Sequence, residues 1–192
     1  VGMAGKDLGA MMKSAQSRKF KPVSLGITVS VHLHTTLRKL TTANVGGLLG
    51  GTDPLLSKEV VIFTAHFDHL GIVKPVNGDS IDNGALDNAS GVSMVLTLAE
   101  GFAHLSQRPK RSMLFLLVGG EEAGTLGSEY YAAHPTVPTG KIAANINIDG
   151  VNMFGETRDL SMIGKGRSTI DEAVNVAAKV AGFTVKPDQF PE

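Results

Sequence analysis

The sequence predicts an α/β fold: a three-layer α/β/α domain around a mixed, largely parallel central sheet. Two continuous apolar runs, at 60–63 and 113–118, are typical of strands covered on both faces, and a third strand of this kind is expected at 142–148. Helical patterns lie between these strands, as in parallel sheets whose strands are joined by helices. An alternating apolar and polar stretch at 23–34 indicates a further strand with one buried face, near a sheet edge.

Before these strands we expect an N-terminal helical segment, residues 1–22, followed by the main domain, residues 23–192. Four apolar side chains repeat at i, i+3, i+4 and i+7 and form one stripe of a short helix: Leu8, Met11, Met12 and Ala15. Pro22 ends this pattern. Within the main domain, the stretch 23–34 is predicted to form a long strand, and a second strand is predicted at 43–49.

The rest of the chain is expected to alternate between loops, helices and strands. We predict a polar loop at 71–84, helices at 90–104, 128–133 and 169–181, and a weaker strand at 160–163. Asn88 or Ser90 is placed to cap the first of these helices, and Gly182 is suited to end the last.

The composition restricts what the domain can bind. Lys plus Arg and Asp plus Glu both number 18, so the formal net charge is zero and gives no reason to expect nucleic acid or an anionic membrane as a partner. The sequence has no cysteine, which excludes disulfides, thiolate zinc ligands and a cysteine nucleophile. Any metal ion must therefore be held by histidine and carboxylate side chains. No apolar run approaches the roughly 20 residues that span a bilayer, and no signal peptide is recognisable.

Residue types that bind metal ions follow all three predicted buried strands. They are His66 after the first, Glu121 and Glu122 after the second, and Asp149 after the third, with Asp87 just before a helix. In open α/β sheets, ligands sit beyond the carboxyl ends of the strands, so these side chains are expected to meet at one rim. Four carboxylates in one crevice repel each other unless a cation compensates them. Histidine and carboxylates without thiolate suit a catalytic zinc site that keeps one position open for water.

The adjacent Glu121 and Glu122 are expected to divide two roles between them. Neighbouring side chains on a turning backbone point in different directions, so one can ligate metal while the other stays free. The free carboxylate can act as a general base toward water. Asp68, two residues after His66, is placed to accept the second N–H of the imidazole and orient the ring.

Four segments resemble those of the co-catalytic zinc aminopeptidases. This family of peptidase clan MH includes bacterial leucyl aminopeptidases and the relatives of glutamate carboxypeptidase and the transferrin receptor. The segments are Thr64–His69, Gly84–Gly91, Glu121–Glu122 and Asn147–Gly150. The resemblance runs from about Pro22 to the end of the chain, and the order and spacing of the four motifs make it specific.

The resemblance implies a zinc-peptidase/phosphorylase-like fold and a role for each matching residue. His66 and Asp149 would hold one zinc, Asp87 would bridge both zincs, and Glu122 would hold the second. Glu121 would be the general base that activates a zinc-bound water, with Asp68 supporting His66. The implied reaction is that of an aminopeptidase, an exopeptidase that hydrolyses the peptide bond next to a free amino terminus of a peptide substrate.

Family members complete the second zinc site with a histidine further along the chain. No residue here matches it before Glu192, so the resemblance implies an internal fragment with an incomplete second site. Relatives also carry a protease-associated domain ahead of this region and are commonly periplasmic or secreted, which is the location that the resemblance implies. We expect self-association of such a fragment through exposed apolar surface.

Several alternatives remain beside this hypothesis. The chain could be a non-catalytic or inactive metal-binding fragment, or the same fold could support a carboxypeptidase or a glutaminyl-cyclase-like activity. His32 and His34 form an HxH pair, which we interpret as a solvated strand face rather than a zinc site. His69 is expected either to help bind substrate or to be structural. Asp79 and Asp82 are interpreted as loop acids, one of which could meet the amino group of a substrate.

Overall fold

The computed structural model describes residues 4–37, 39–153 and 155–187. It divides the chain into two compact units, Val1–Leu40 and Thr41–Glu192. In the first unit the predicted helix is confirmed as α1, Leu8–Ala15. The helix begins after Asp7, whose carboxylate accepts a hydrogen bond from the backbone N–H of Ala10 at 3.2 Å and so satisfies one of the free donors at the helix start.

The strand predicted at 23–34 is wrong, because this stretch is irregular in the structure. Its apolar side chains are open to solvent: Val29, Val31 and Leu33 are 73%, 67% and 79% exposed. Alternation specifies which side chains would share a face, but a strand also needs a neighbour for its N–H and C=O groups. The described residues of the first unit form no strand that could supply partners for these N–H and C=O groups.

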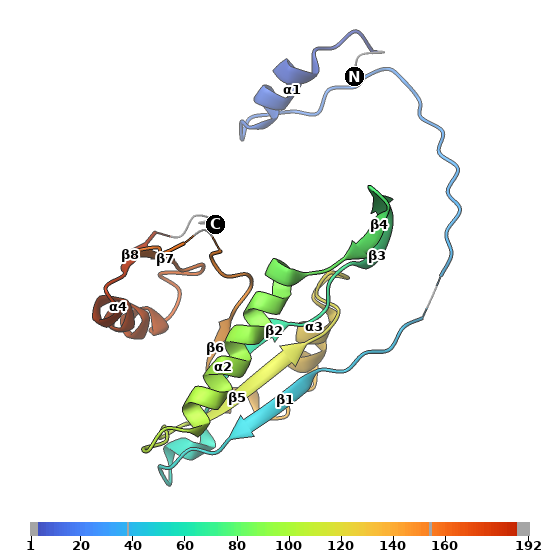
Figure 1. Cartoon of the computed structure of the whole chain (residues 1–192). Helices are drawn as coiled ribbons and strands as arrows, with labels where there is room; N and C mark the ends of the chain where they lie inside the picture. Colours follow the sequence, from blue (N-terminus) through green and yellow to red (C-terminus); the bar gives the residue numbers. More distant parts are fainter. Residues whose placement is uncertain (1–3, 38, 154, 188–192) are drawn as a thin grey trace. The chain divides into compact units, whose positions relative to one another are not determined.

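The second unit is built on a four-stranded sheet (Figure 1). Its strands are β1 (Val45–Leu49), β2 (Val60–His66), β5 (Ser112–Val118) and β6 (Ile142–Asn147), in the order β1-β5-β2-β6. β2 runs parallel to both β5 and β6, whereas β1 is antiparallel to β5 and lies at the edge. The mixed, largely parallel sheet expected from the sequence is therefore confirmed.

The helix α2 (Gly91–Ala103) covers one face of this sheet (Figure 1). Val95 and Phe102 of α2 pack on Phe63, Ala65 and Phe115 of the two central strands. The rings of Phe63 and Phe115 stack with their centroids 5.6 Å apart. Val95 is fully buried, and complete burial of a side chain of this size stabilises a fold by about 1.5–3 kcal/mol, so the packing of Val95 anchors α2 to the strands.

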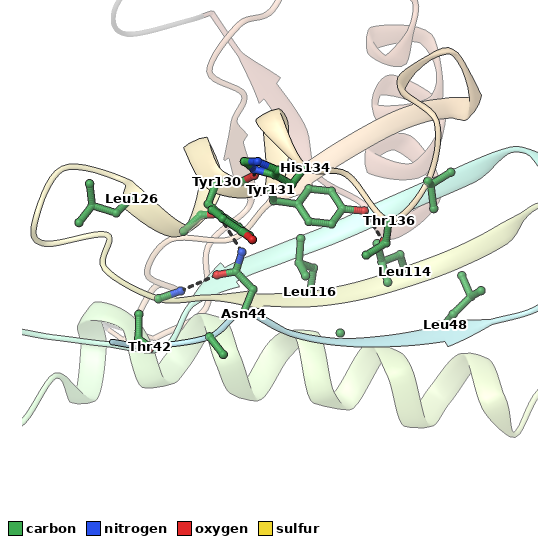
Figure 2. Close-up of a pocket in the computed structure, with 15 residues that line it drawn as sticks. Thr42, Asn44, Leu48, Leu114, Leu116, Leu126, Tyr130, Tyr131, His134 and Thr136 are labelled. Atoms are coloured by element: carbon green, nitrogen blue, oxygen red, sulfur yellow. Dashed lines mark hydrogen bonds between the residues drawn. The ribbon is translucent and has the colours of Figure 1, made fainter. Parts of the chain in front are cut away.

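The opposite face carries α3 (Leu126–Ala133), which completes the three layers. Tyr131 of α3 packs against the apolar cluster of this face, which contains Ile62, Leu114 and Leu116. A cavity of about 730 Å³ lies here, and Figure 2 shows Tyr130, Tyr131, Leu114 and Leu116 around it. Asn44 joins β1 to α3 because it donates to the Gly127 carbonyl at 2.8 Å and accepts from the Gly119 N–H at 3.2 Å (Figure 2).

The polar loop predicted at 71–84 is instead a β-hairpin. Its strands are β3 (Gly71–Val76) and β4 (Asp79–Asp82), which pair in antiparallel fashion. Asn77 and Gly78 between them both have positive φ, 52° and 87°. An Asn-Gly pair is a strong hairpin signal because both residues tolerate this conformation, so the turn was visible in the sequence.

The last part of the chain forms β7 (Asp159–Ser161), α4 (Ile170–Ala181) and β8 (Thr184–Lys186), with β7 and β8 parallel. Gly182 ends α4 with a φ of 77°, in agreement with the predicted C-cap. β8 was not predicted, since a three-residue strand carries almost no pattern. Across the described ranges, every helix is too short or too polar to cross a membrane.

Candidate metal centre

The candidate site lies where the three parallel strands end. His66 is the last residue of β2, Glu121 follows β5 after two glycines, and Asp149 follows β6 after Ile148. Backbone hydrogen bonds continue past the strands, from the Phe67 N–H to the Val118 carbonyl at 3.0 Å and from the Ile148 N–H to the Thr64 carbonyl at 2.8 Å. Because parallel strands share a direction, these ends meet at one edge of the sheet, as expected.

A first group of possible ligands consists of His66, Asp87 and Asp149. The Nε2 atom of His66 lies 3.0 Å from Asp87 Oδ1 and 3.4 Å from Asp149 Oδ1. The imidazole is almost fully buried, with 3% of its side chain exposed, whereas the two carboxylates are about half exposed, 55% and 51%. The group is thus anchored in the core and open on its carboxylate side.

The His66 ring is oriented by the turn that follows it. Its Nδ1 lies 3.1 Å from the main-chain oxygen of Asp68. A carbonyl can only accept, so Nδ1 carries a proton, and Nε2 is the nitrogen that faces the first group. The sequence predicts the Asp68 carboxylate as this acceptor, and the structure shows the Asp68 carbonyl in its place. That carboxylate instead accepts from the Glu121 N–H at 3.2 Å, which ties the ends of β2 and β5 together.

A second group consists of His69, Asp87 and Glu122. His69 Nδ1 lies 2.6 Å from Glu122 Oε1, and its Nε2 lies 3.1 Å from Asp82 Oδ1 of the hairpin. Asp87 belongs to both groups, as a bridging ligand would. Glu122 and Asp87 were expected in a second site, and His69 was not. The sequence feature that could have indicated His69 is its position three residues after His66, in the same turn after β2.

Glu121 belongs to neither group, although it directly precedes Glu122 of the second. Its carbonyl accepts from the Gly124 and Thr125 N–H groups at 2.8 Å each, which fixes the turn after β5. Its negative charge acts on His66. Burial lowers the pKa of His66, but the Asp68 carbonyl and the charges of Asp149 and Glu121 outweigh it and raise the pKa above its ordinary value.

The surroundings of His69 carry the same sign of charge. Burial lowers the pKa of His69, and the contacts with Glu122 and then Asp82 outweigh it, so its pKa is also raised. Two histidines are thus surrounded by carboxylates at one rim of the sheet. This excess of negative charge favours cations.

Asn88 connects the two sides of the site. Its amide is buried, donates to the Ile148 carbonyl at 3.0 Å, and accepts from the Gly91 and Gly150 N–H groups at 3.0 Å each. These contacts join the segment that carries Asp87 to the segment that carries Asp149. The sequence suggested Asn88 only as a helix cap, and the bond from Gly91 is such a cap. The link to the end of β6 depends on tertiary contacts.

The sequence profile of Peptidase family M28 matches residues 44–192, more than half of the chain. A "Probable zinc metalloprotease" of Pyrenophora tritici-repentis is 34% identical over 110 residues, which cover 57% of this chain and 24% of that protein. A "Probable zinc metalloprotease" of Pyricularia oryzae is 33% identical over 107 residues, which cover 56% of this chain and 19% of that protein. The chain therefore spans a quarter or less of the length of these curated relatives.

Two solved structures share the fold. The Peptidase M28 precursor from Shewanella amazonensis has a TM-score of 0.53 and 26% sequence identity, over 74% of this chain and 29% of that one. An aminopeptidase from Aneurinibacillus sp. strain AM-1 has a TM-score of 0.52 and 23% identity, over 74% of this chain and 33% of that one. The family profile covers more than half of the chain, and this chain belongs to peptidase family M28.

Proposed function

We propose that this chain is part of a zinc-dependent exopeptidase, an aminopeptidase that hydrolyses the N-terminal bond of a peptide. The observation that carries the proposal is the pair of His and carboxylate groups that share Asp87 at the strand ends. Glu121 belongs to neither group, and its charge acts on His66 of the first, which suits a proton acceptor at this site. The names of the two fungal relatives support zinc as the metal.

The donor atoms of these two groups suit a divalent cation. In the first group, His66 Nε2 faces two carboxylate oxygens at 3.0 and 3.4 Å and its other nitrogen is already bonded to a carbonyl. We assign one ion to His66, Asp87 and Asp149, and a second to Asp87 and Glu122. When bound, such ions polarise the scissile carbonyl and lower the pKa of the attacking water.

Glu121 is the residue of this chain that moves a proton in the proposed reaction. It would accept the proton of the attacking water and pass it to the leaving amine. Its N–H is bonded to the Asp68 carboxylate, and the Asp68 carbonyl is bonded to His66, so one residue positions both the base and a ligand. The carboxylates at the rim would attract the positive charge of a free amino terminus.

Substrates with free and blocked amino termini test this proposal. A longer form of the protein that contains this chain should hydrolyse amino-acyl anilides in the presence of zinc and leave their N-acetylated counterparts intact. A chelator should abolish the hydrolysis, and zinc should restore it. Cleavage from the carboxyl end of N-blocked peptides would favour a carboxypeptidase, and cyclisation of N-terminal glutamine would favour a glutaminyl cyclase. Failure on every free-amino substrate would contradict the aminopeptidase proposal.

A further inference from the structure

Glu121 and Glu122 lie on the 119–127 loop, which leads from the end of β5 into the first turn of α3. The Glu121 carbonyl accepts hydrogen bonds from the N–H groups of Gly124 and Thr125 at 2.8 Å each, so the loop curls back on the residue proposed as the base. Thr125 has a φ of 56°, a conformation that a β-branched residue adopts only at a cost. The position of Glu121 therefore depends on contacts that keep this loop in its present form.

The two ends of the 119–127 loop touch each other. A Cβ atom added at Gly127 would collide with the Gly119 carbonyl and lie 2.7 Å from the Gly119 nitrogen. One side chain from outside the loop joins both ends, the amide of Asn44 just before β1. It donates to the Gly127 carbonyl at 2.8 Å and accepts from the Gly119 N–H at 3.2 Å (Figure 2). Asn44 thus uses both polar atoms of its amide to keep the loop closed.

The loop is also held from the turn after β2. The Asp68 carboxylate accepts from the Glu121 N–H at 3.2 Å, in the middle of the segment that Asn44 closes. Asn44 itself lines the cavity on the α3 face of the sheet (Figure 2). Both of its hydrogen bonds described above go to backbone atoms of the loop ends, so its effect on the reaction passes through the loop.

We infer that Asn44 is a positioning residue for the general base Glu121. By closing the 119–127 loop it supports the strained backbone of Thr125 and keeps the Glu121 N–H on the Asp68 carboxylate. Without the amide, the loop ends separate and Thr125 can relax, which displaces the Glu121 carbonyl bonded to it. A misplacement of about 1 Å can cost about 100-fold in rate. The inference rests on the proposed function, because Glu121 moves the proton there.

Asn44→Ala tests the inference in a longer form of the protein that hydrolyses amino-acyl anilides. At saturating zinc, kcat should fall by about 10–100-fold and KM should stay within about twofold, because the change affects the placement of Glu121. Ser112→Ala is the matched control. The Ser112 hydroxyl accepts from the Gly51 N–H at 3.0 Å and donates to the Ser57 carbonyl at 2.6 Å, at the opposite end of β5. This control should lower the melting temperature and keep kcat.

A double variant separates positioning from a general structural role. Once Glu121→Gln has removed the base, the placement of that side chain no longer limits the rate. Adding Asn44→Ala should then lower kcat by no more than about twofold. Gly127→Ala disturbs the same closure with Asn44 unchanged, because its Cβ would lie 2.5 Å from the Asn44 Oδ1 atom. It should reproduce the loss of kcat.

Amide hydrogen exchange of the 192-residue chain gives a readout that needs no activity. The Gly119 N–H should be protected in the unchanged chain. In Asn44→Ala, the N–H groups of Gly119, Gly124 and Thr125 should exchange at least about tenfold faster. This increase should exceed that of the amides of β2, which report on opening of the whole sheet. Circular dichroism shows whether each variant is folded.

An unchanged kcat in folded Asn44→Ala, or losses that multiply in the double variant, would overturn the inference. A Gly119 amide that exchanges in the unchanged chain as fast as an exposed amide would also overturn it, and this outcome needs no variant. If the unchanged longer form hydrolyses no free-amino substrate, the proposed function fails. If it is active and Asn44→Ala is equally active, the positioning role alone fails.

Discussion

The Oδ1 atom of Asp87 lies 3.0 Å from the Nε2 atom of His66, although one residue is half exposed before α2 and the other is buried at the end of β2. The same carboxylate also belongs to the group of His69 and Glu122. One side chain therefore connects the two candidate metal positions, and its loss should affect both of them.

Asp87→Asn should weaken zinc binding at both positions, because the amide removes a charge that both ions share. The effect should exceed the roughly 10–100-fold that loss of an outer partner causes. Titration calorimetry measures it. Asp79→Asn is the matched control, since that carboxylate accepts from the Ile81 N–H in the hairpin and belongs to neither group. Loss of a single equivalent in Asp87→Asn would contradict the bridging role.

Glu121→Gln should retain both zinc equivalents and lose catalysis. Removal of a general base typically lowers the rate by about 10²–10⁴-fold, and kcat should fall by this amount in a form of the protein that hydrolyses amino-acyl anilides. Glu129→Gln, on the exposed first turn of α3, serves as the control and should keep full activity. A near-normal kcat in Glu121→Gln would remove this residue from the mechanism.

Two glycines of α2 should respond to alanine in opposite directions. A Cβ at Gly91 would meet the Asn88 side chain and lie 2.6 Å from the Ile148 carbonyl, so Gly91→Ala should lower the free energy of unfolding by about 1–3 kcal/mol. Nothing lies within 4 Å of a Cβ at Gly101, so Gly101→Ala should raise it by about 0.5–1 kcal/mol. Urea unfolding of both variants compares them. Equal effects would show that the contact of Gly91 with Asn88 does not matter.

Asp53 should make stability depend on acid pH. Its Oδ1 accepts from the Leu56 and Leu55 N–H groups at 2.9 Å each, and these bonds hold the pKa of the carboxyl below its ordinary value. A lowered pKa in the folded state means that the contribution is present above the unfolded pKa of about 3.9 and is lost as the pH falls through the folded value.

Asp53→Asn should therefore melt at a lower temperature than the wild-type chain at pH 6. The difference between the two melting temperatures should shrink once the pH lies below the folded pKa. Thermal unfolding followed by circular dichroism in the presence of a chelator measures both temperatures. A difference that stays constant from pH 6 to pH 2.5 would refute the account.

Much of the architecture was predictable because it depends on local pattern. The continuous apolar run of β5 requires cover on both faces, and the helices α2 and α3 supply it. Gly182 ends α4 because only a residue with positive φ suits that position. The misplaced strand at 23–34 failed for the opposite reason, since pairing depends on a partner strand and alternation alone does not provide one.

The order of residues along the chain was enough to place His66, Glu121 and Asp149 at one rim, because parallel strands bring their carboxyl ends together whatever the details of the loops. It was not enough to show that the carbonyl of Asp68, rather than its carboxylate, orients His66, or that His69 turns toward Glu122 with Asp82 behind it. Those contacts depend on the directions of side chains at turns. Such directions follow from hydrogen bonds and close approaches between distant segments, such as Gly84 over the His69 ring, which no local pattern encodes.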